Sequence, residues 1–221
     1  YCVPKFISNK NMELNEVYHL SIKKPVPNSI NESKPVLLTG SNASGKSTFL
    51  NILTGADMGG RMTGVIERGE SLKIGYYHQS GMNFNPDETV LDIVNDTWLL
   101  NRFLFPHEML NNKVEKLSGG ERRRLYLLTI LMQQPNLLIL DEPTNHLDVQ
   151  TLSRLENQLA SYRGTLIVIS HDRYFLDRVA DRVIEIADGH AEFYSGNYSF
   201  YIEEKQARFN MQLKQYEQEQ A

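Results

Sequence analysis

Residues 40–47 have the composition and spacing of a phosphate-binding loop. They read Gly-Ser-Asn-Ala-Ser-Gly-Lys-Ser, which matches G-x-x-x-x-G-K-[ST] and lies between a short apolar run and a helical pattern. In that context backbone N–H groups curl around phosphate oxygens, and the helix N-terminus adds a positive dipole. The Lys46 ammonium would reach the β- and γ-phosphates, and the Ser47 hydroxyl would bind Mg²⁺. The alternative is a glycine-rich loop that only caps an ordinary helix. The predicted nucleotide contacts are Gly40, Ser41, Asn42, Ala43, Ser44, Gly45, Lys46, Ser47 and Thr48.

A second signal is an apolar run, residues 137–140, that ends in two carboxylates, Asp141 and Glu142. The carboxyl ends of parallel strands form the edge of a sheet where ligands bind. Asp141 is suited to a metal ion or its water shell, and Glu142 is suited to polarise an attacking water. Alone, the run could be a strand followed by a solvated turn. In a chain that also carries the phosphate-binding loop, it indicates hydrolysis of a nucleoside triphosphate.

The third signal is the tripeptide Ser118, Gly119 and Gly120. Ser118 is a good helix N-cap and Glu121 follows at the capping-box interval, so the start of a helix is one interpretation. Two consecutive glycines also leave backbone N–H groups accessible to a γ-phosphate.

The elements that must position these residues are short apolar runs that alternate with helical patterns after residue 34. Such alternation predicts a mainly parallel sheet covered by helices. The predicted helices are residues 46–54, 90–100, 120–133 and 149–162, and the predicted buried strands are residues 35–39, 136–140 and 165–170. Residues 65–67 and 72–77 are predicted to form a hairpin-like layer, and residues 182–187 and 191–194 a final hairpin around Asp188-Gly189.

The composition excludes several classes of protein. The 221 residues are 41% apolar and 23% charged, which fits a globular core rather than disorder. The longest apolar runs have four residues, far below the ~20 that a membrane-spanning helix needs. The net charge of −4 rules out a polycation, and the single cysteine, Cys2, rules out an intrachain disulfide. No signal pattern is present, so we expect a cytoplasmic protein without membrane insertion.

The order of these motifs resembles the ABC-type ATPases. Ser-Gly-Gly between a phosphate-binding loop and a Leu-Ile-Leu-Asp-Glu strand is the arrangement of that family, in which this loop reaches the nucleotide on a second copy. The resemblance implies a metal-sensing role for Gln79, a loop at residues 145–148 that crosses the dimer interface, and a γ-phosphate contact for His171. The catalytic residues are then Glu142, His171 and Gln79, the metal ligands are Ser47, Gln79 and Asp141, and Ser118, Gly119 and Gly120 join the nucleotide contacts.

Longer stretches, residues 140–148, 170–177 and 195–201, resemble the ABC-F branch, whose known members are soluble, carry two ATPase domains per chain and mostly act on ribosomes. The resemblance covers roughly residues 36–205. It implies ATP and Mg²⁺ as cofactors, ATP hydrolysis as the activity, and a second cassette and the ribosome as partners. The implied fold class is an α/β P-loop NTPase with a RecA-like core, an ABC-type helical subdomain at about residues 85–133 and an antiparallel β layer. Residues 1–205 would form the nucleotide-binding domain and residues 206–221 a C-terminal helix.

Two features depart from the ABC-F pattern. The chain holds one cassette, and the segment from Tyr201 onward resembles the start of the linker between cassettes; the alternative is a helix packed on its own domain. The resemblance implies an aromatic residue beneath adenine, for which Tyr18 is the candidate by its interval from the loop, or Phe6 if residues 28–34 are an insertion; the alternative is that either is an ordinary core residue. Residues 26–30 and 37–42 resemble MutS-type ATPases, which a chimera of the two families would explain.

Three other functions remain open from the sequence. The chain could be the ATP-binding subunit of a membrane transporter, a MutS-type DNA-repair ATPase head, or an ATP-binding fragment or chimera with negligible turnover.

Overall fold

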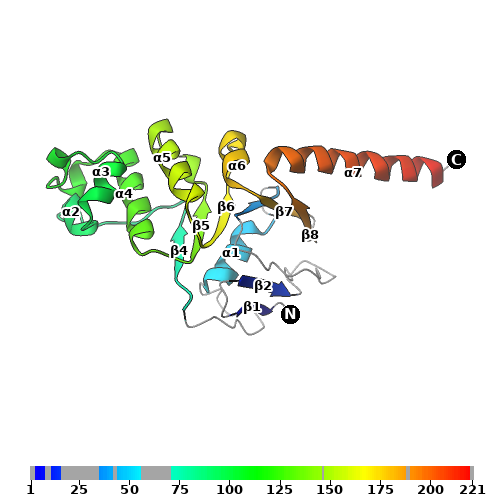
Figure 1. Ribbon diagram of the computed structural model, residues 1–221, viewed down its shortest axis with the longest axis horizontal. Coiled ribbons are helices and arrows are strands. Elements are labelled where there is room, and N and C mark those ends of the chain that lie inside the picture. Colours follow the sequence, from blue (N-terminus) through cyan, green and yellow to red (C-terminus); the bar gives the residue numbers. More distant parts are fainter. Residues whose placement is uncertain are drawn as a thin grey trace.

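The computed structural model describes residues 3–7, 11–15, 35–41, 44–55, 71–145, 147–187 and 190–219. In this part of the chain six strands form one sheet in the order β4-β5-β6-β3-β7-β8, with only β8 antiparallel to its neighbour (Figure 1). The strands are β3 (Val36–Thr39), β4 (Ile74–Tyr77), β5 (Leu137–Asp141), β6 (Thr165–Ile169), β7 (Arg182–Ala187) and β8 (His190–Ser195). β1 (Val3–Ile7) and β2 (Asn11–Asn15) form a separate antiparallel pair.

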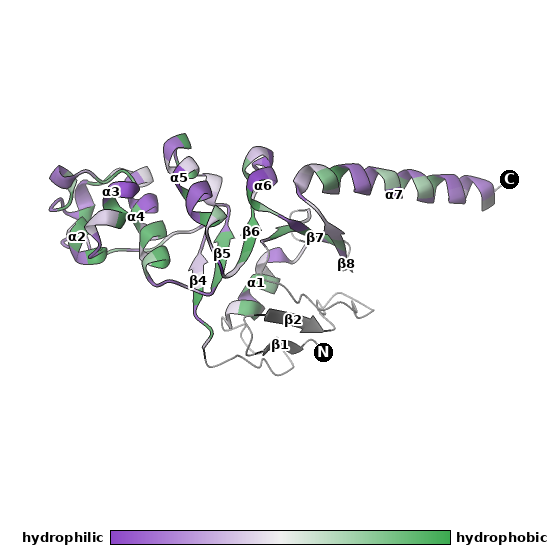
Figure 2. Cartoon of the chain, viewed as in Figure 1, coloured by the Kyte–Doolittle hydropathy of each residue, from purple (hydrophilic) through white to green (hydrophobic). Residues whose placement is uncertain are grey.

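The central strands are apolar on both faces, as buried parallel strands must be. Alternate residues of β5 divide between two clusters of buried side chains: Leu138 and Leu140 pack with residues of the later helices, whereas Leu137 and Ile139 pack with Leu50 of α1 (Lys46–Thr54). Figure 2 shows β5 and β6 as hydrophobic along their length. The sheet is therefore the middle layer, and the loops at its carboxyl edge are held from both sides.

Side-chain caps fix where the longer helices begin. Ser118 accepts a hydrogen bond from the Glu121 amide at the start of α4 (Gly119–Met132), Asp148 does the same for Thr151 in α5 (Val149–Ala160), and Asp172 for Phe175 in α6 (Arg173–Val179). Each cap satisfies an amide that would otherwise lack an acceptor and is worth about 1 kcal/mol. The remaining helical elements are α2 (Val90–Ile93), α3 (Thr97–Arg102), α7 (Tyr198–Glu219) and the 3₁₀ turns η1 (His107–Met109), η2 (Val114–Lys116) and η3 (Pro143–Asn145).

The predicted mainly parallel α/β fold and the final hairpin are confirmed, and the strand predicted at residues 72–77 is present as β4. β4 pairs parallel with β5, with Ile74 opposite Leu137 and Tyr77 opposite Leu140. The alternating pattern of this strand does not predict its parallel partner, because contacts with residues more than 50 positions away decide it. Residues 65–67, its predicted partner in a hairpin-like layer, lie outside the described residues, so that pairing stays a prediction. The turn at residues 188–189 lies outside them as well.

The single helix predicted for residues 90–100 is wrong, because two short helices replace it. α2 ends at Ile93, because the following residue, Val94, is extended with a φ of −123°, and α3 begins separately with the Asp96 side chain accepting from the Leu99 amide. Aspartate favours a cap over a helix interior because its carboxylate competes for backbone donors. Figure 1 shows α2, α3 and α4 at one end of the molecule, beyond β4.

The C-terminal helix α7 is packed on the domain only at its start. Tyr201 is buried against Tyr194 with ring centroids 4.9 Å apart, and Lys205 bonds Glu185 of β7. Beyond Arg208, which lies over the Tyr194 ring, the helix projects away from the sheet (Figure 1). The predicted apolar stripe is exposed, by 43% at Ile202, 58% at Phe209, 47% at Leu213 and 59% at Tyr216. In the described part of the chain, no helix is long and apolar enough to cross a membrane.

Candidate functional site

The carboxyl ends of β3, β5 and β6 lie together because of the strand register. Asp141, the last residue of β5, pairs with Ile169, the last residue of β6, and Leu37 of β3 pairs with Val168. The phosphate-binding loop follows β3, the carboxylate pair spans the end of β5, with Asp141 in the strand and Glu142 after it, and His171 lies in the loop after β6. The structure thus brings together at one edge residues that are up to 131 positions apart (171 minus 40).

The phosphate-binding loop depends on glycine at its first position. Gly40 has φ +146°, and a Cβ there would lie 2.1 Å from the Ile186 carbonyl oxygen, so a larger residue would force the loop off β7. α1 begins at Lys46, and Ser47 is exposed in its first turn. Asn42 and Ala43 lie outside the described residues, and Thr48 lies in α1.

The Lys46 side chain folds back over the loop. Its Nζ donates to the carbonyl oxygens of Gly40 and Ser41, at 2.8 Å each. Burial lowers the pKa of Lys46, while the nearby carboxylates of Glu142 and Asp141 oppose this change. An ammonium that is partly desolvated and faces two carboxylates is suited to meet a phosphate group, which would add negative charge beside it.

The two carboxylates after β5 are both buried, with exposed fractions of 8% for Asp141 and 7% for Glu142. Burial raises the pKa of each, because water no longer solvates the charged form. Asp141 Oδ2 accepts a hydrogen bond from the Tyr76 hydroxyl at 3.4 Å. The sequence motifs give no role to Tyr76, although its position three residues before Gln79 is a usable signal.

Glu142 is held in an unusual backbone conformation. Its φ of +51° is left-handed, which costs a non-glycine residue of order 1 kcal/mol, and its N–H donates to the Ile169 carbonyl at 2.8 Å. Its Oε1 lies 3.3 Å from His171 Nε2, whereas Oε2 is buried without a hydrogen-bond partner among the described residues. A buried, partly unsatisfied carboxylate of raised pKa is suited to accept a proton from water.

The His171 ring lies at the open side of this pair, with 73% of its side chain exposed. The turn that carries it is fixed by Ser170, whose Oγ accepts from the Asp172 amide at 3.1 Å and lies 2.9 Å from Thr144 Oγ1. This hydroxyl contact joins the loop after β6 to the loop after β5. His171 is thereby kept within reach both of Glu142 and of a ligand entering from solvent.

Gln79 follows β4, one strand beyond the carboxylates, and is exposed. Its backbone carbonyl accepts a hydrogen bond from Arg123 of α4. Tyr126, one turn further on, donates to the Tyr76 carbonyl at 2.9 Å and accepts from the His78 amide at 3.3 Å. The segment that leads into Gln79 is therefore anchored by α4.

Ser118, Gly119 and Gly120 lie apart from the phosphate-binding loop of the same chain. They are exposed at the N-terminus of α4, which packs on β4, and β5 and β6 separate β4 from the strand that leads into the phosphate-binding loop. Glu121 accepts from the Ser118 amide at 2.7 Å and completes the predicted capping box. A Cβ on Gly119 would meet no atom within 4 Å, so the space above this turn is open.

The donors suit Mg²⁺ bound together with phosphate. Among the described residues no group of three or more His, Cys, Asp or Glu side chains could hold a metal ion by itself. Mg²⁺ is commonly held by one or two protein oxygens plus substrate phosphates, and Ser47 and Asp141 supply such oxygens. Tyr18, the predicted adenine contact, lies outside the described residues.

Comparisons with known proteins agree with this arrangement. A family model described as ABC transporter matches residues 24–145, and a second model with the same description matches residues 184–221. The chain is 44% identical over 189 residues to the uncharacterized ABC transporter ATP-binding protein YfmR of Bacillus subtilis, which covers 77% of this chain and 29% of that protein. It is 38% identical over 187 residues to ABC transporter F family member 5 of Arabidopsis thaliana, covering 79% and 27%.

A third relative has a name that states a function. The energy-dependent translational throttle protein EttA of Mycobacterium tuberculosis is 52% identical over 99 residues, which cover 45% of this chain and 18% of that protein. The chain spans less than a third of the length of these relatives.

Among solved structures, the dimeric structure of an ATP-binding cassette in a post-hydrolysis state bound to ADP and Pi matches with a TM-score of 0.60 at 20% identity, covering 88% of this chain and 95% of that one. At this identity the match shows the fold alone.

Proposed function

Because this chain belongs to the ABC transporter family and has ABC-F proteins among its relatives, we propose that it hydrolyses Mg²⁺–ATP in a site shared between two cassettes. The observation that carries the proposal is the meeting of Lys46, Asp141 and Glu142 at one edge of the sheet. We also infer a nucleotide-binding domain over residues 1–205 that includes a helical subdomain at about residues 85–133. α7 starts at Tyr198 and so crosses the inferred boundary with residues 206–221.

The chemistry follows from the character of each group. Lys46 and the loop amides would hold the β- and γ-phosphates, and bound Mg²⁺ would neutralise charge on the phosphate oxygens. Glu142, with its raised pKa, would orient a water and take its proton, a contribution of about 10²–10⁴ in rate. His171, 3.3 Å from Glu142, would donate to the γ-phosphate, and Gln79 would complete the metal surroundings.

The proposal of a shared site rests on the isolation of Ser118 to Gly120. This loop is exposed, and two strands separate the strand beneath it from the strand that enters the phosphate-binding loop. Two copies related by a two-fold axis would place each loop against the other copy's nucleotide, because an isologous interface satisfies both contacts at once.

We further propose that the cassette serves a ribosome-associated translation factor in the cytoplasm. The support is the similarity to F-family proteins and to a translational throttle protein. The second candidate is the ATP-binding subunit of a transporter, which the name of YfmR favours.

The test of the shared site is ATPase activity per chain over a hundredfold range of protein concentration. Activity should rise with concentration and should be lost in Ser118→Arg, whose side chain would fill the interface. Ser161→Arg, in an exposed turn after α5, is the matched control and should behave as wild type. Activity that stays flat per chain and is indifferent to Ser118→Arg would mean that one copy holds a complete site.

The test of the ribosomal role is co-sedimentation with ribosomes. Glu142→Gln with ATP should pellet with ribosomes, and Lys46→Ala should not, because the first variant would retain ATP and the second would not bind it. If neither pellets and a membrane protein co-purifies tightly with the chain, the transporter assignment replaces the ribosomal one.

A further inference from the structure

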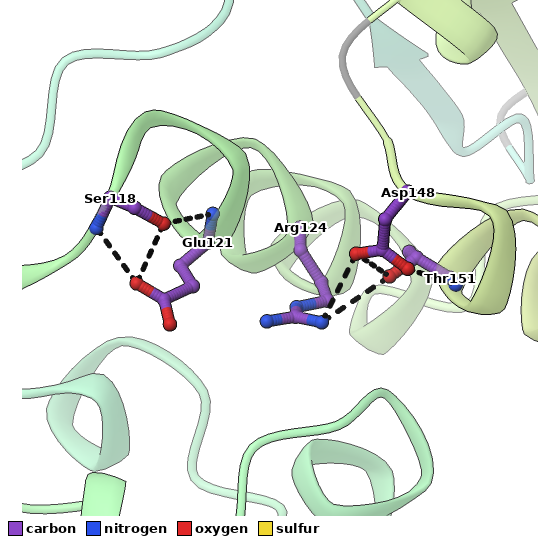
Figure 3. A network of polar contacts seen from close by, with 5 residues as sticks. All are labelled: Ser118, Glu121, Arg124, Asp148 and Thr151. Atoms are coloured by element: carbon purple, nitrogen blue, oxygen red, sulfur yellow. Dashed lines mark hydrogen bonds and ion pairs between the residues drawn. The ribbon is translucent and has the colours of Figure 1, made fainter.

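Arg124 of α4 connects two segments that are distant in sequence. Figure 3 shows its guanidinium reaching from α4 to the start of α5, where Nη1 lies 3.5 Å from Asp148 Oδ2 and 3.3 Å from Thr151 Oγ1. Asp148 in turn accepts from the Thr151 amide at 2.8 Å and from the Thr151 hydroxyl at 2.9 Å. Arg124 therefore contacts two side chains that are held in place by their own hydrogen bonds in the capped first turn of α5.

The environment of Arg124 is unusual for a charged group. Its side chain is only 10% exposed, it packs 4.9 Å from the Phe105 ring centroid, and its buried Nε has no hydrogen-bond partner among the described residues. A buried guanidinium is costly unless it is paired, and a buried ion pair is weak support for stability. Burial of this charge is therefore better explained by a positional role than by its contribution to folding.

The Ser118–Gly120 turn is the part of the proposed shared site that would face a second cassette, and the resemblance to ABC-type ATPases implies the same for the loop at residues 145–148. Arg124 follows Ser118 by six residues on the same rigid helix, a rise of about 9 Å. Asp148 closes the loop of residues 145–148, which begins three residues after Glu142. One side chain thus links the exposed turn at Ser118 to Gly120 with the loop that follows the carboxylate pair.

We propose that Arg124 is a positioning residue that fixes the spacing between the Ser118–Gly120 turn and the loop at residues 145–148, so that both meet the second cassette together. The inference rests on the proposed shared site. Arg124 touches neither nucleotide nor water in this scheme and acts only through Asp148 and Thr151. Loss of the link should weaken pairing of the cassettes and leave ATP binding to the single chain intact, because the phosphate-binding loop is on the other side of the sheet's centre.

The test uses Glu142→Gln as the parent, which should accumulate ATP-bound dimers, and measures dimerisation by sedimentation velocity. Adding Arg124→Gln should weaken dimerisation at least tenfold while the ATP affinity of the monomer, measured by calorimetry, stays within twofold. Because removal of a buried side chain could unfold the chain, Asp148→Asn is the second variant. Asparagine keeps the helix cap but lacks the charge, and Asp148 is 58% exposed, so the fold should persist.

The double variant separates a specific link from general damage. If Arg124 acts through Asp148, Arg124→Gln with Asp148→Asn should be no weaker than the single changes, since both break the same contact. Arg154→Gln, an exposed arginine of α5, removes the same charge elsewhere and should leave dimerisation unchanged. Dimerisation equal to the parent in Arg124→Gln, or full additivity in the double variant, would overturn the positioning role. Failure of the parent itself to dimerise with ATP would instead overturn the shared site and the inference with it.

Discussion

Lys46 is the mobile cation of the phosphate-binding loop, and its two hydrogen bonds to loop carbonyls can be exchanged for bonds to phosphate. Lys46→Ala should therefore weaken ATP binding by at least about 10²-fold, since hydrogen bonds to charged groups are worth roughly 1.5–3 kcal/mol each. Calorimetric titration with Mg²⁺–ATP measures the loss. Lys214→Ala on the exposed part of α7 is the control. Equal affinity in the two variants would contradict the assignment of Lys46.

Glu142 should reduce the stability of the chain at neutral pH. Burial raises its pKa in the folded state, so folding becomes less favourable as pH rises from the ordinary glutamate value of about 4.3 through the raised value. Glutamine has no proton to lose. Glu142→Gln should thus raise the thermal midpoint at pH 7.5, raise it less at pH 5, and slow hydrolysis by at least about 10².

Thermal melts at the two pH values check this, with the exposed Glu115→Gln as the control. A gain in midpoint that is the same at pH 5 and pH 7.5 would show that the ionisation of Glu142 is not its source. An unchanged single-turnover rate would remove Glu142 from the proposed chemistry.

Gly75 and Gly119 allow the packing of a strand to be tested separately from the function of the exposed turn before α4. A Cβ on Gly75 of β4 would lie 2.7 Å from Ile130 Cγ2 of α4 and 2.7 Å from Pro135 Cγ, whereas one on Gly119 would meet nothing within 4 Å. Gly75→Ala should destabilise the fold by about 1–3 kcal/mol, as overpacking does. Gly119→Ala should be neutral or slightly stabilising, because alanine favours helices, yet should lower ATPase activity.

Urea denaturation and ATPase assays on the same preparations distinguish the two effects. Equal loss of stability in both variants would mean that the turn before α4 is packed rather than open. Full activity in Gly119→Ala would argue against a role for this turn in the shared site.

The molecule as a whole should not need the outer half of α7 for its stability. Beyond Arg208 the helix is exposed, whereas Tyr201 and Lys205 fasten its start to β7 and β8. A chain that ends at residue 209 should keep its thermal midpoint within a few degrees and its ATP affinity. Tyr201→Ala should instead cost about 3–5 kcal/mol, because it leaves a cavity beside Tyr194. A large loss on truncation would show that the outer helix packs on the domain.

Much of the fold could be predicted because its signals are local. The capping box at Ser118, the helices that start near Lys46 and Val149, and the buried strands β5 and β6 follow from neighbouring residue types, and the structure confirms them. The sequence also places Glu142 and His171 directly after predicted strands. The structure adds that these strands are neighbours and that the two side chains lie 3.3 Å apart. Their catalytic roles stay predictions.

The sequence by itself determined the elements and the residue types at the carboxyl edge, since a cap, an apolar run and a phosphate-binding loop are each encoded within a few residues. Only the tertiary structure decided that β4 lies parallel to β5, that Glu142 takes a left-handed φ, and that Arg124 bonds Asp148. These features depend on pairings between segments far apart in the chain. Their energies come from packing and burial at sites that no short pattern describes.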